Sequence, residues 1–303
     1  MARPATALAL AAALGLALPG LAGCSGGILD PQGPVAAQEL TILWDSLGIM
    51  LAIVIPTILA TLGVAWWFRA GNARANYRPD WEYSGRIEMV VWAIPTMTVL
   101  LLGGIGWVSA RDLDPPKPLA ADTPPVTVQV VSLDWKWLFI YPDLDIASVN
   151  HLVVPAGTPV SFQLTSDGVM NSFFVPQLGS QIYTMPGMIT RLNLRADRPG
   201  RYPGISAQFS GAGFPDMLFT LEAVPRDAFD GWVANARAQG EALDAPAYAR
   251  LSQSSRADRP RTFRDVMPGL FDAVANPGRN PALPQTNPHW PGHEYPPLNK
   301  DPE

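Results

Sequence analysis

Long apolar runs dominate the first third of the chain. Residues 46–68 contain no charged side chain, and residues 89–110 contain none either. A helix needs about 20 such residues to cross a bilayer. Trp66 and Trp107 lie near the ends of these runs, where membrane interfaces favour aromatic rings. The pattern predicts two transmembrane helices, at 46–68 and 89–110.

An earlier apolar run, residues 5–22, follows Arg3 and ends in Leu21-Ala22-Gly23-Cys24. A positive start, an apolar stretch and small residues before a cut are typical of an export signal. The ending resembles a bacterial lipobox, in which the cysteine is lipidated. We expect residues 1–23 to be a lipoprotein signal peptide and Cys24 to carry the lipid. The alternative is an ordinary buried helix with a chance cysteine.

The orientation of the two predicted spans follows from the charges between them. The connection, residues 69–88, carries Arg69, Arg74, Arg78 and Arg86. Because cytoplasmic loops are enriched in Lys and Arg, this connection should be cytoplasmic. Residues 24–45 and everything after the second span then lie in the periplasm, which a lipidated N-terminus also requires. The expected location is the inner membrane of a bacterium.

Beyond the second span the pattern changes to short apolar stretches. Residues 111–125 are rich in proline, which is typical of a stiff, extended linker. Val126–Leu133 alternates apolar and polar side chains, as a half-buried strand does. Further strand-like runs occupy residues 152–154, 159–164, 172–175, 189–194 and 217–224. Many short strands predict an antiparallel β-sandwich or barrel over residues 126–225.

The C-terminal part has a different pattern. Phe229, Trp232, Val233 and Ala236 are spaced as one face of an amphipathic helix, so residues 226–252 should form a helical region beside the sandwich. Residues 253–303 are polar and then rich in proline, which predicts an extended or disordered tail.

Composition limits the function classes. Charged residues make up 16% of the chain, against about 25% in an ordinary soluble domain. The net charge of −5 gives no reason to expect nucleic-acid binding. The single cysteine excludes a disulfide within the chain. Pro291 interrupts any helix that would pair His289 with His293, so we expect these two histidines to be solvated in the tail. His151 has no partner nearby in the sequence, and we expect it at the surface.

Three separated segments carry a resemblance to a known family. They are Leu133-Asp-Trp-Lys-Trp-Leu-Phe, Asn171-Ser-Phe-Phe-Val-Pro-Gln-Leu-Gly, and Ser206-Ala-Gln-Phe-Ser-Gly-Ala-Gly-Phe-Pro-Asp-Met. In this order, after two spans and a proline-rich linker, they resemble subunit II of the haem–copper oxidases over about residues 40 to 240. The resemblance implies a transmembrane hairpin followed by an all-β cupredoxin-like Greek-key sandwich.

The departures from the family pattern concern its dinuclear copper site. The resemblance places the metal ligands of copper-bearing members at Asn171, Ser206, Gln208, Ser210, Phe214 and Met217. Only Met217 keeps a ligand type. A dinuclear copper centre needs soft thiolates to bridge its metals, and serine hydroxyls are hard, poor ligands. We therefore expect no metal at these positions and no cofactor in this chain.

Loss of the copper relay suits an oxidase whose donor is dissolved in the membrane. The resemblance therefore implies the quinol-oxidase branch, similar to the cytochrome bo-type ubiquinol oxidases, which reduce O₂ to water with proton translocation. It implies that haem and copper belong to subunit I, and that the partners are subunits I, III and IV and the lipid bilayer. The donor is ubiquinol or menaquinol; residues 177–183 and 210–214 look closer to the ubiquinol type.

The roles of Glu88 and of the pair Trp135 and Trp137 each have two possible interpretations. Glu88 is either an acid stabilised at a helix N-terminus or, as the resemblance implies, an acid near a proton entry into subunit I. Trp135 and Trp137 correspond to an electron-entry stack in copper-bearing relatives, but without a metal we expect them to serve packing. Glycines in the spans should allow close contact with a larger membrane subunit: Gly63, Gly103, Gly104 and Gly106.

Other functions remain open on the sequence. A membrane-anchored cupredoxin-like binding or assembly lipoprotein outside any oxidase would share most of these features. A menaquinol oxidase subunit II is a second alternative. A copper-bearing cytochrome c oxidase subunit is a third, and the absent cysteines argue against it. Co-elution with haem-bearing subunits would separate an oxidase subunit from the lipoprotein.

Overall fold

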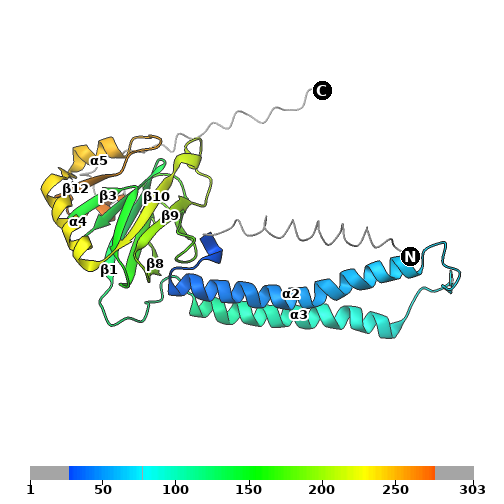
Figure 1. Cartoon of the computed structure of the whole chain (residues 1–303). Coiled ribbons are helices and arrows are strands. Elements are labelled where there is room, and N and C mark those ends of the chain that lie inside the picture. The colour runs from blue at the N-terminus through cyan, green and yellow to red at the C-terminus, as the bar shows by residue number, and fades with distance from the viewer. Residues whose placement is uncertain (1–26, 77, 277–303) are drawn as a thin grey trace, which may run out of the picture. The chain divides into compact units, whose positions relative to one another are not determined.

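The computed structural model describes residues 27–76 and 78–276. These residues form two compact units, one of residues 38–114 and one that joins the residues before 38 to those after 114. The predicted signal peptide, Cys24, His289 and His293 lie outside the described residues. Each unit is described here by itself, in the element labels of Figure 1.

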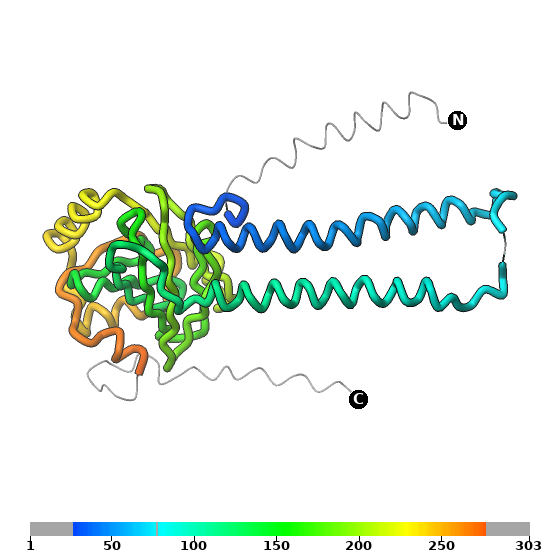
Figure 2. Tube along the Cα trace, turned by 90° about the horizontal axis from the view of Figure 1, so that it is seen from below, coloured from blue at the N-terminus to red at the C-terminus, as the bar shows by residue number. Residues whose placement is uncertain are grey.

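The two apolar runs form long helices, α2 (Pro34–Trp67) and α3 (Gly85–Asp112). Helix α2 begins before the predicted span and ends one residue short of its end, whereas α3 extends beyond its span at both ends. Both are long and apolar enough to cross a membrane. The hydroxyls of Thr57 and Thr61 donate to the carbonyls of Ile53 and Thr57, so these polar groups are satisfied within the helix. Figure 2 shows α2 and α3 running alongside one another from a common connection.

The β-domain consists of two sheets. The seven-stranded sheet has the order β11-β12-β3-β2-β1-β5-β8 and the five-stranded sheet the order β4-β10-β9-β6-β7. The first contains β1 (Val126–Leu133), β2 (Lys136–Tyr141), β3 (Ile146–Val149), β5 (Val160–Ser166), β8 (Thr190–Leu194), β11 (Glu241–Ala242) and β12 (Arg261–Arg264). The second contains β4 (His151–Pro155), β6 (Asn171–Phe174), β7 (Ile182–Thr184), β9 (Gly200–Ser206) and β10 (Leu218–Val224).

This arrangement confirms the predicted fold class, two apolar helices with a cupredoxin-like sandwich and a C-terminal helix. It differs from a purely antiparallel sandwich, because β1 pairs with β5 and β4 pairs with β10 in parallel. Parallel neighbours need a crossover connection, and here the chain leaves for the other sheet before it returns. The crossovers bring segments that are far apart in the sequence to the same end of the sandwich.

An inner core fills the space between the two sheets. Phe173 stacks on Phe219 with ring centroids 4.9 Å apart, and Trp137 meets both rings edge-on. The Tyr141 hydroxyl donates to the Val153 carbonyl (2.8 Å) and accepts from the Val153 amide (3.0 Å). Helix α4 (Arg226–Gln239) adds Phe229, Val233 and Ala236 to the same cluster, as its spacing predicted.

An outer core covers the other face of the seven-stranded sheet. Val131, Leu133, Leu138 and Ile140 are buried there under residues 241–276, called the C-terminal cover below. The cover contains β11, β12 and two short helices, α5 (Ala245–Leu251) and α6 (Leu270–Ala275). It contributes the buried side chains of Leu243, Ala247, Tyr248, Leu251, Phe263, Leu270, Phe271, Ala273, Val274 and Ala275.

The outer core corrects two predictions. An extended tail from residue 253 is wrong for residues 253–276, where β12 pairs with β3 and α6 is buried on the sheet. The half-buried alternation expected for β1 holds only for its first half, because Val131 and Leu133 lie under the cover. Strands that are covered on both faces do not need polar side chains at alternate positions.

The chain segments next to both helices are fixed to the β-domain. The Gln32 amide donates to the Gln177 carbonyl (2.7 Å), and the Asp197 amide donates to the Gln32 carbonyl (2.9 Å). A side chain at Gly33 would collide with the Arg195 carbonyl, so this close approach requires glycine. In the chain segment that follows α3, the Pro116 carbonyl accepts a hydrogen bond from the Asn193 side-chain amide (3.0 Å).

Candidate functional site

The three sequence segments that carry the resemblance meet at one end of the five-stranded sheet. Antiparallel pairing of β6 with β9 places Phe173 opposite Ser206, and pairing of β9 with β10 places Ile205 opposite Leu218. The start of β6, the end of β9 and the start of β10 are therefore neighbours. We call this region, residues 206–217 with Asn171, the vacated loop.

Asn171 and Ser206 form the buried base of the vacated loop. They are 2% and 4% exposed, and the Ser206 hydroxyl lies 3.1 Å from Asn171 Oδ1 and 3.3 Å from the Gln208 carbonyl oxygen, both of which can accept its proton. Asn171 Nδ2 donates in turn to the Val169 carbonyl (3.2 Å). Buried polar groups lower stability unless they are hydrogen-bonded. The side chains of Asn171 and Ser206 are both hydrogen-bonded.

Ser210 and Met217 form a second pair. The Ser210 hydroxyl lies 3.9 Å from the Met217 sulfur, a weak acceptor, and Met217 is fully buried. The Met217 carbonyl accepts from the Ser206 amide (3.3 Å), which joins the two pairs through the backbone. Met217 also belongs to the inner core, so its side chain has a packing role independent of any metal.

The remaining two positions of the predicted set, Gln208 and Phe214, form no side-chain hydrogen bond with these pairs among the contacts of the described residues. Gln208 takes part through its backbone carbonyl. The Phe214 ring packs on Phe209, with centroids 5.7 Å apart, and Phe209 is 71% exposed at the tip of the loop. The structure thus brings together Asn171, Ser206, Ser210 and Met217, and places Phe214 in an aromatic pair at the surface.

These donors do not fit a dinuclear copper centre. They comprise two hydroxyls, one amide and one thioether, and no thiolate or imidazole to bridge or hold two copper ions. Among the residues that the structure describes, no group of three or more His, Cys, Asp or Glu side chains is placed to hold a metal ion. Hydrogen bonds occupy the polar atoms of Asn171 and Ser206 instead.

Trp135 forms one wall of the vacated loop. Its backbone is left-handed (φ 62°), and its ring nitrogen donates to the Ser210 carbonyl (2.9 Å). A side chain at Gly213 would overlap the Trp135 ring, so the loop closes on the ring only with glycine there. The Arg256 guanidinium lies over the ring at 5.6 Å. Trp137, by contrast, is fully buried in the inner core.

Lys136, next to Trp135, joins the C-terminal cover to the vacated loop. The sequence predicted no role for it. Its ammonium donates to the carbonyls of Leu251 (3.0 Å) and Gln253 (2.6 Å) and lies 3.7 Å from the Asp258 carboxylate. The residue is 1% exposed. Burial lowers the pKa of Lys136, and the Asp258 carboxylate opposes this only in part. A lysine inside an aromatic, strand-like stretch was the available signal.

His151 and Glu88, two residues considered in the sequence, lie outside the vacated loop. His151 is half-buried on β4, and its Nε2 lies 2.8 Å from the Glu222 carboxylate, so it is a paired residue of the five-stranded sheet. Glu88 is exposed in the first turn of α3, and its amide donates to the Ser84 carbonyl (3.0 Å).

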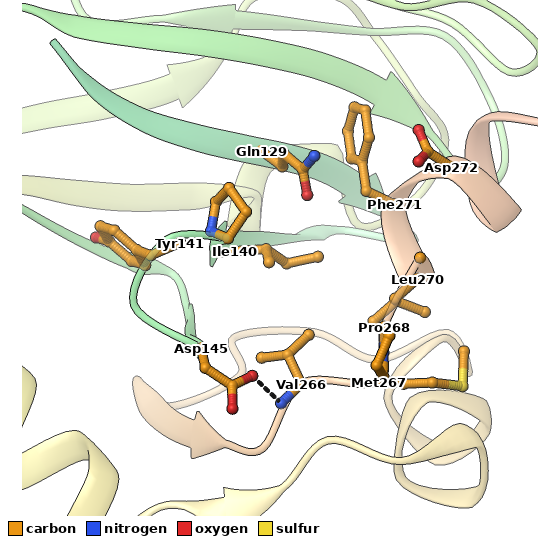
Figure 3. A pocket seen from close by; sticks show the side chains of 12 residues that line it. Gln129, Ile140, Tyr141, Asp145, Val266, Met267, Pro268, Leu270, Phe271 and Asp272 are labelled. Carbon is orange, nitrogen blue, oxygen red and sulfur yellow. Dashed lines mark hydrogen bonds between the residues drawn. The ribbon is translucent and has the colours of Figure 1, made fainter.

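A cavity of about 300 Å³ lies between the seven-stranded sheet and the C-terminal cover. Figure 3 shows Gln129 and Ile140 on the sheet side and Phe271 on the cover side. Asp145 Oδ1 accepts from the Val266 amide (3.0 Å) and closes one edge. The cavity contains none of the predicted site residues, so the vacated loop remains the candidate site.

Two family models match the β-domain. One, described as "Cytochrome C oxidase subunit II, periplasmic domain", matches residues 143–224. The other, described as "COX Aromatic Rich Motif", matches residues 237–277, which correspond closely to the C-terminal cover. The vacated loop lies within the first match, and the cover is a recognised module of its own.

Curated relatives match most of the chain. "Cytochrome bo(3) ubiquinol oxidase subunit 2" of Pseudomonas aeruginosa is 48% identical over 84% of this chain and 77% of the relative. "Ubiquinol oxidase subunit 2" of Acetobacter aceti is 47% identical over 84% of this chain and 83% of the relative. "Quinol oxidase subunit 2" of Bacillus cereus is 39% identical over 76% of this chain and 80% of the relative. The chain therefore belongs to the cytochrome c oxidase subunit II superfamily, and within it to the subunit II family of the haem–copper ubiquinol oxidases.

Proposed function

We propose that this chain is a redox-inactive subunit II of a terminal ubiquinol oxidase that reduces O₂ to water with proton translocation. The observation that carries the proposal is the vacated loop, in which Ser206 bonds Asn171 and Ser210 faces Met217. An electron relay through this domain would need thiolates and imidazoles at these positions. The Ser206 hydroxyl and the Asn171 amide form buried hydrogen bonds within the protein instead.

The names of two curated relatives favour ubiquinol as the donor, since those from Pseudomonas aeruginosa and Acetobacter aceti are both ubiquinol oxidase subunits. Ubiquinol is dissolved in the membrane and reaches the membrane subunits directly. An exported copper relay is then unnecessary, which explains why the sandwich persists while its ligands do not. Haem, copper and the oxygen chemistry are assigned to subunit I.

The proposed membrane arrangement follows from α2 and α3. The arginines of their connection, Arg69, Arg74, Arg78 and Arg86, favour a cytoplasmic location for it. The β-domain and the N-terminus are then periplasmic, with Cys24 as the lipid-bearing residue. A two-pass lipoprotein of the inner membrane satisfies both requirements.

The helices support a scaffolding role. Every side chain of α3 and nearly all of those of α2 are at least partly exposed in the single chain, and Ala36 is the one buried residue of α2. A side chain added at Gly63, Gly103, Gly104 or Gly106 would meet open space, so these positions leave smooth surfaces for close helix contact. Subunit I is the proposed partner for these faces.

Purification of the intact complex tests the function. The chain should co-elute with haem-bearing subunits, and the complex should lack the near-infrared absorption of a mixed-valence dicopper unit. Met217→Leu, which keeps side-chain volume and removes the sulfur, should leave the spectrum of the complex unchanged. A near-infrared band that disappears in this variant would contradict the redox-inactive assignment, and failure to co-elute would contradict the subunit assignment.

Glu88 is the proposed acid near the proton entry. Its carboxyl group is exposed in the first turn of α3, at the end of the helix that joins the connection, so it has access to water. Glu88→Gln should slow proton uptake severalfold in the complex reconstituted into liposomes, because the amide cannot exchange protons. Asp80→Asn is the matched control in the same connection. Equal proton uptake by both variants would leave Glu88 with only its helix-terminal role.

A further inference from the structure

Charge is unevenly divided along the connection between α2 and α3. The half that follows α2 contains Arg69, Arg74 and Arg78 and no acidic residue, whereas the half that leads into α3 contains Asp80, Glu82 and Glu88 with one arginine, Arg86. Each sign suits the helix terminus beside it, since cations stabilise the C-terminus of a helix and anions its N-terminus. The basic half carries the larger net charge, +3 against −2.

Local contacts hold the basic half in a defined shape. The Arg69 guanidinium stacks over the Trp66 ring at 4.8 Å and donates to the Trp66 carbonyl (2.7 Å). Asn72 Nδ2 donates to the Trp67 carbonyl (2.6 Å), and Asn72 Oδ1 accepts from the Arg74 amide (3.2 Å). The last turn of α2 therefore continues into a turn in which Arg69 lies over the exposed Trp66 ring and the Arg74 backbone is fixed by Asn72.

The three arginines are available to an external anion. All are exposed, and within the described part of the chain no carboxylate forms an ion pair with Arg69, Arg74 or Arg78. Arginines of the β-domain differ, because Arg195 pairs with Asp197 at 2.7 Å and Arg261 with Asp258 at 3.3 Å. Trp66, Trp67 and Phe68, which directly precede Arg69 in the chain, are 63%, 46% and 58% exposed.

We propose that Arg69, Arg74 and Arg78, with Trp66 and Trp67, form a binding site for anionic phospholipid headgroups. The inference rests on the membrane arrangement proposed above. Guanidinium groups bind phosphate oxygens in a planar, two-pronged geometry. Tryptophan rings favour the headgroup level of the bilayer. A basic cluster directly beside a transmembrane helix attracts anionic lipid, and each cation near the surface raises lipid affinity about fivefold.

Lipid titration of the purified complex tests the site. The delipidated complex is titrated with phosphatidylglycerol and with phosphatidylcholine, and native mass spectrometry counts the lipids retained by this subunit. Phosphatidylglycerol should bind more tightly, and Arg74→Gln with Arg78→Gln should weaken it about 25-fold. Arg250→Gln with Arg259→Gln, an equal charge change on the C-terminal cover, should have no effect. Millimolar inorganic phosphate should not displace the lipid, because it offers no acyl chains.

Three results would overturn the proposal. Equal affinity for the two lipids would show that the arginines do not select charge. Displacement by inorganic phosphate would indicate a site for free anions. Loss of a protein subunit from the Arg74→Gln, Arg78→Gln complex would indicate that a carboxylate of a partner subunit occupies the arginines. In the first two cases the haem-bearing complex still co-elutes, so failure of the lipid site is distinguishable from failure of the proposed function.

Discussion

The seven-stranded sheet buries both of its faces, but the two faces are built differently. Its inner face packs against a second sheet through aromatic rings, with Phe173 and Phe219 stacked at 4.9 Å. Its outer face is covered by residues 241–276, whose two short helices and two short strands contribute mainly aliphatic side chains. The inner layer is a second sheet, whereas the outer layer combines two short helices with β11 and β12, which extend the edge of the seven-stranded sheet.

Contacts with both layers fix the shape of the vacated loop. Met217 anchors the loop in the inner core, and Trp135 anchors it from the other side through the Ser210 carbonyl. The segment that carries Trp135 is held in turn by the cover, through Lys136 and through the Ser254 hydroxyl, which donates to Asp134 (2.6 Å). The inner core and the C-terminal cover therefore both stabilise the vacated loop.

The largest expected effect comes from opening the inner core. Phe173 is fully buried among four rings, so Phe173→Ala should lower the free energy of unfolding by about 3–5 kcal/mol. Leu270→Ala in the outer core should cost about 2–5 kcal/mol, nearer the lower limit, because an irregular cover can collapse into the space. Thermal unfolding of the complex with hydrogen exchange resolves both.

Hydrogen exchange distinguishes the two layers. Phe173→Ala should raise amide exchange throughout both sheets, whereas Leu270→Ala should raise it chiefly within residues 241–276. If Leu270→Ala loosened the five-stranded sheet as much as the cover, the two faces would form one cooperative unit and the comparison would fail.

A smaller effect should follow from cutting the polar ties. Lys136→Met fills similar space but leaves the carbonyls of Leu251 and Gln253 without their donor, which should cost about 1–3 kcal/mol. Exchange should rise around Trp135 and in the vacated loop. Arg250→Met on the exposed side of the cover is the control and should change stability little. An unchanged loop in Lys136→Met would mean that the inner core alone supports it.

The smallest effect is a pH dependence of the outer core. Burial raises the pKa of Tyr248, and the nearby Asp167 carboxylate adds to the rise. Above about pH 10 the unfolded chain loses this phenolic proton while the folded chain keeps it, so stability falls as pH rises. Tyr248→Phe should remove up to about 1.4 kcal/mol per pH unit from that slope.

Alkaline denaturation of the parent and variant complexes measures this slope. Tyr183→Phe is the control, because the Tyr183 ring is 43% exposed. Tyr141, in the inner core, also has a pKa raised by burial, so part of the alkaline slope should persist in Tyr248→Phe. A Tyr248→Phe slope equal to that of the parent would place the alkaline sensitivity entirely in the inner layer.

Local composition and motif order determined much of this protein in advance. The apolar runs predicted α2 and α3, since a membrane-length helix needs only local hydrophobicity. The order of three motifs predicted the sandwich, and Ser206 and Ser210 in place of thiols predicted a site unsuited to dinuclear copper. These conclusions depend on which side chains are present, which is readable without coordinates.

Only the tertiary structure decided the outer layer. Lys136 reaches carbonyls more than a hundred residues away, and β12 pairs with β3 across a similar separation, so no local pattern marks either contact. Leu251, Phe263 and Leu270 lie in three separate elements, α5, β12 and α6, each too short to show a helical or strand period in the sequence. Whether residues 241–276 are buried depends on the apolar outer face of the seven-stranded sheet that receives them. The sequence of residues 241–276, which is largely polar and contains proline, does not specify that contact alone.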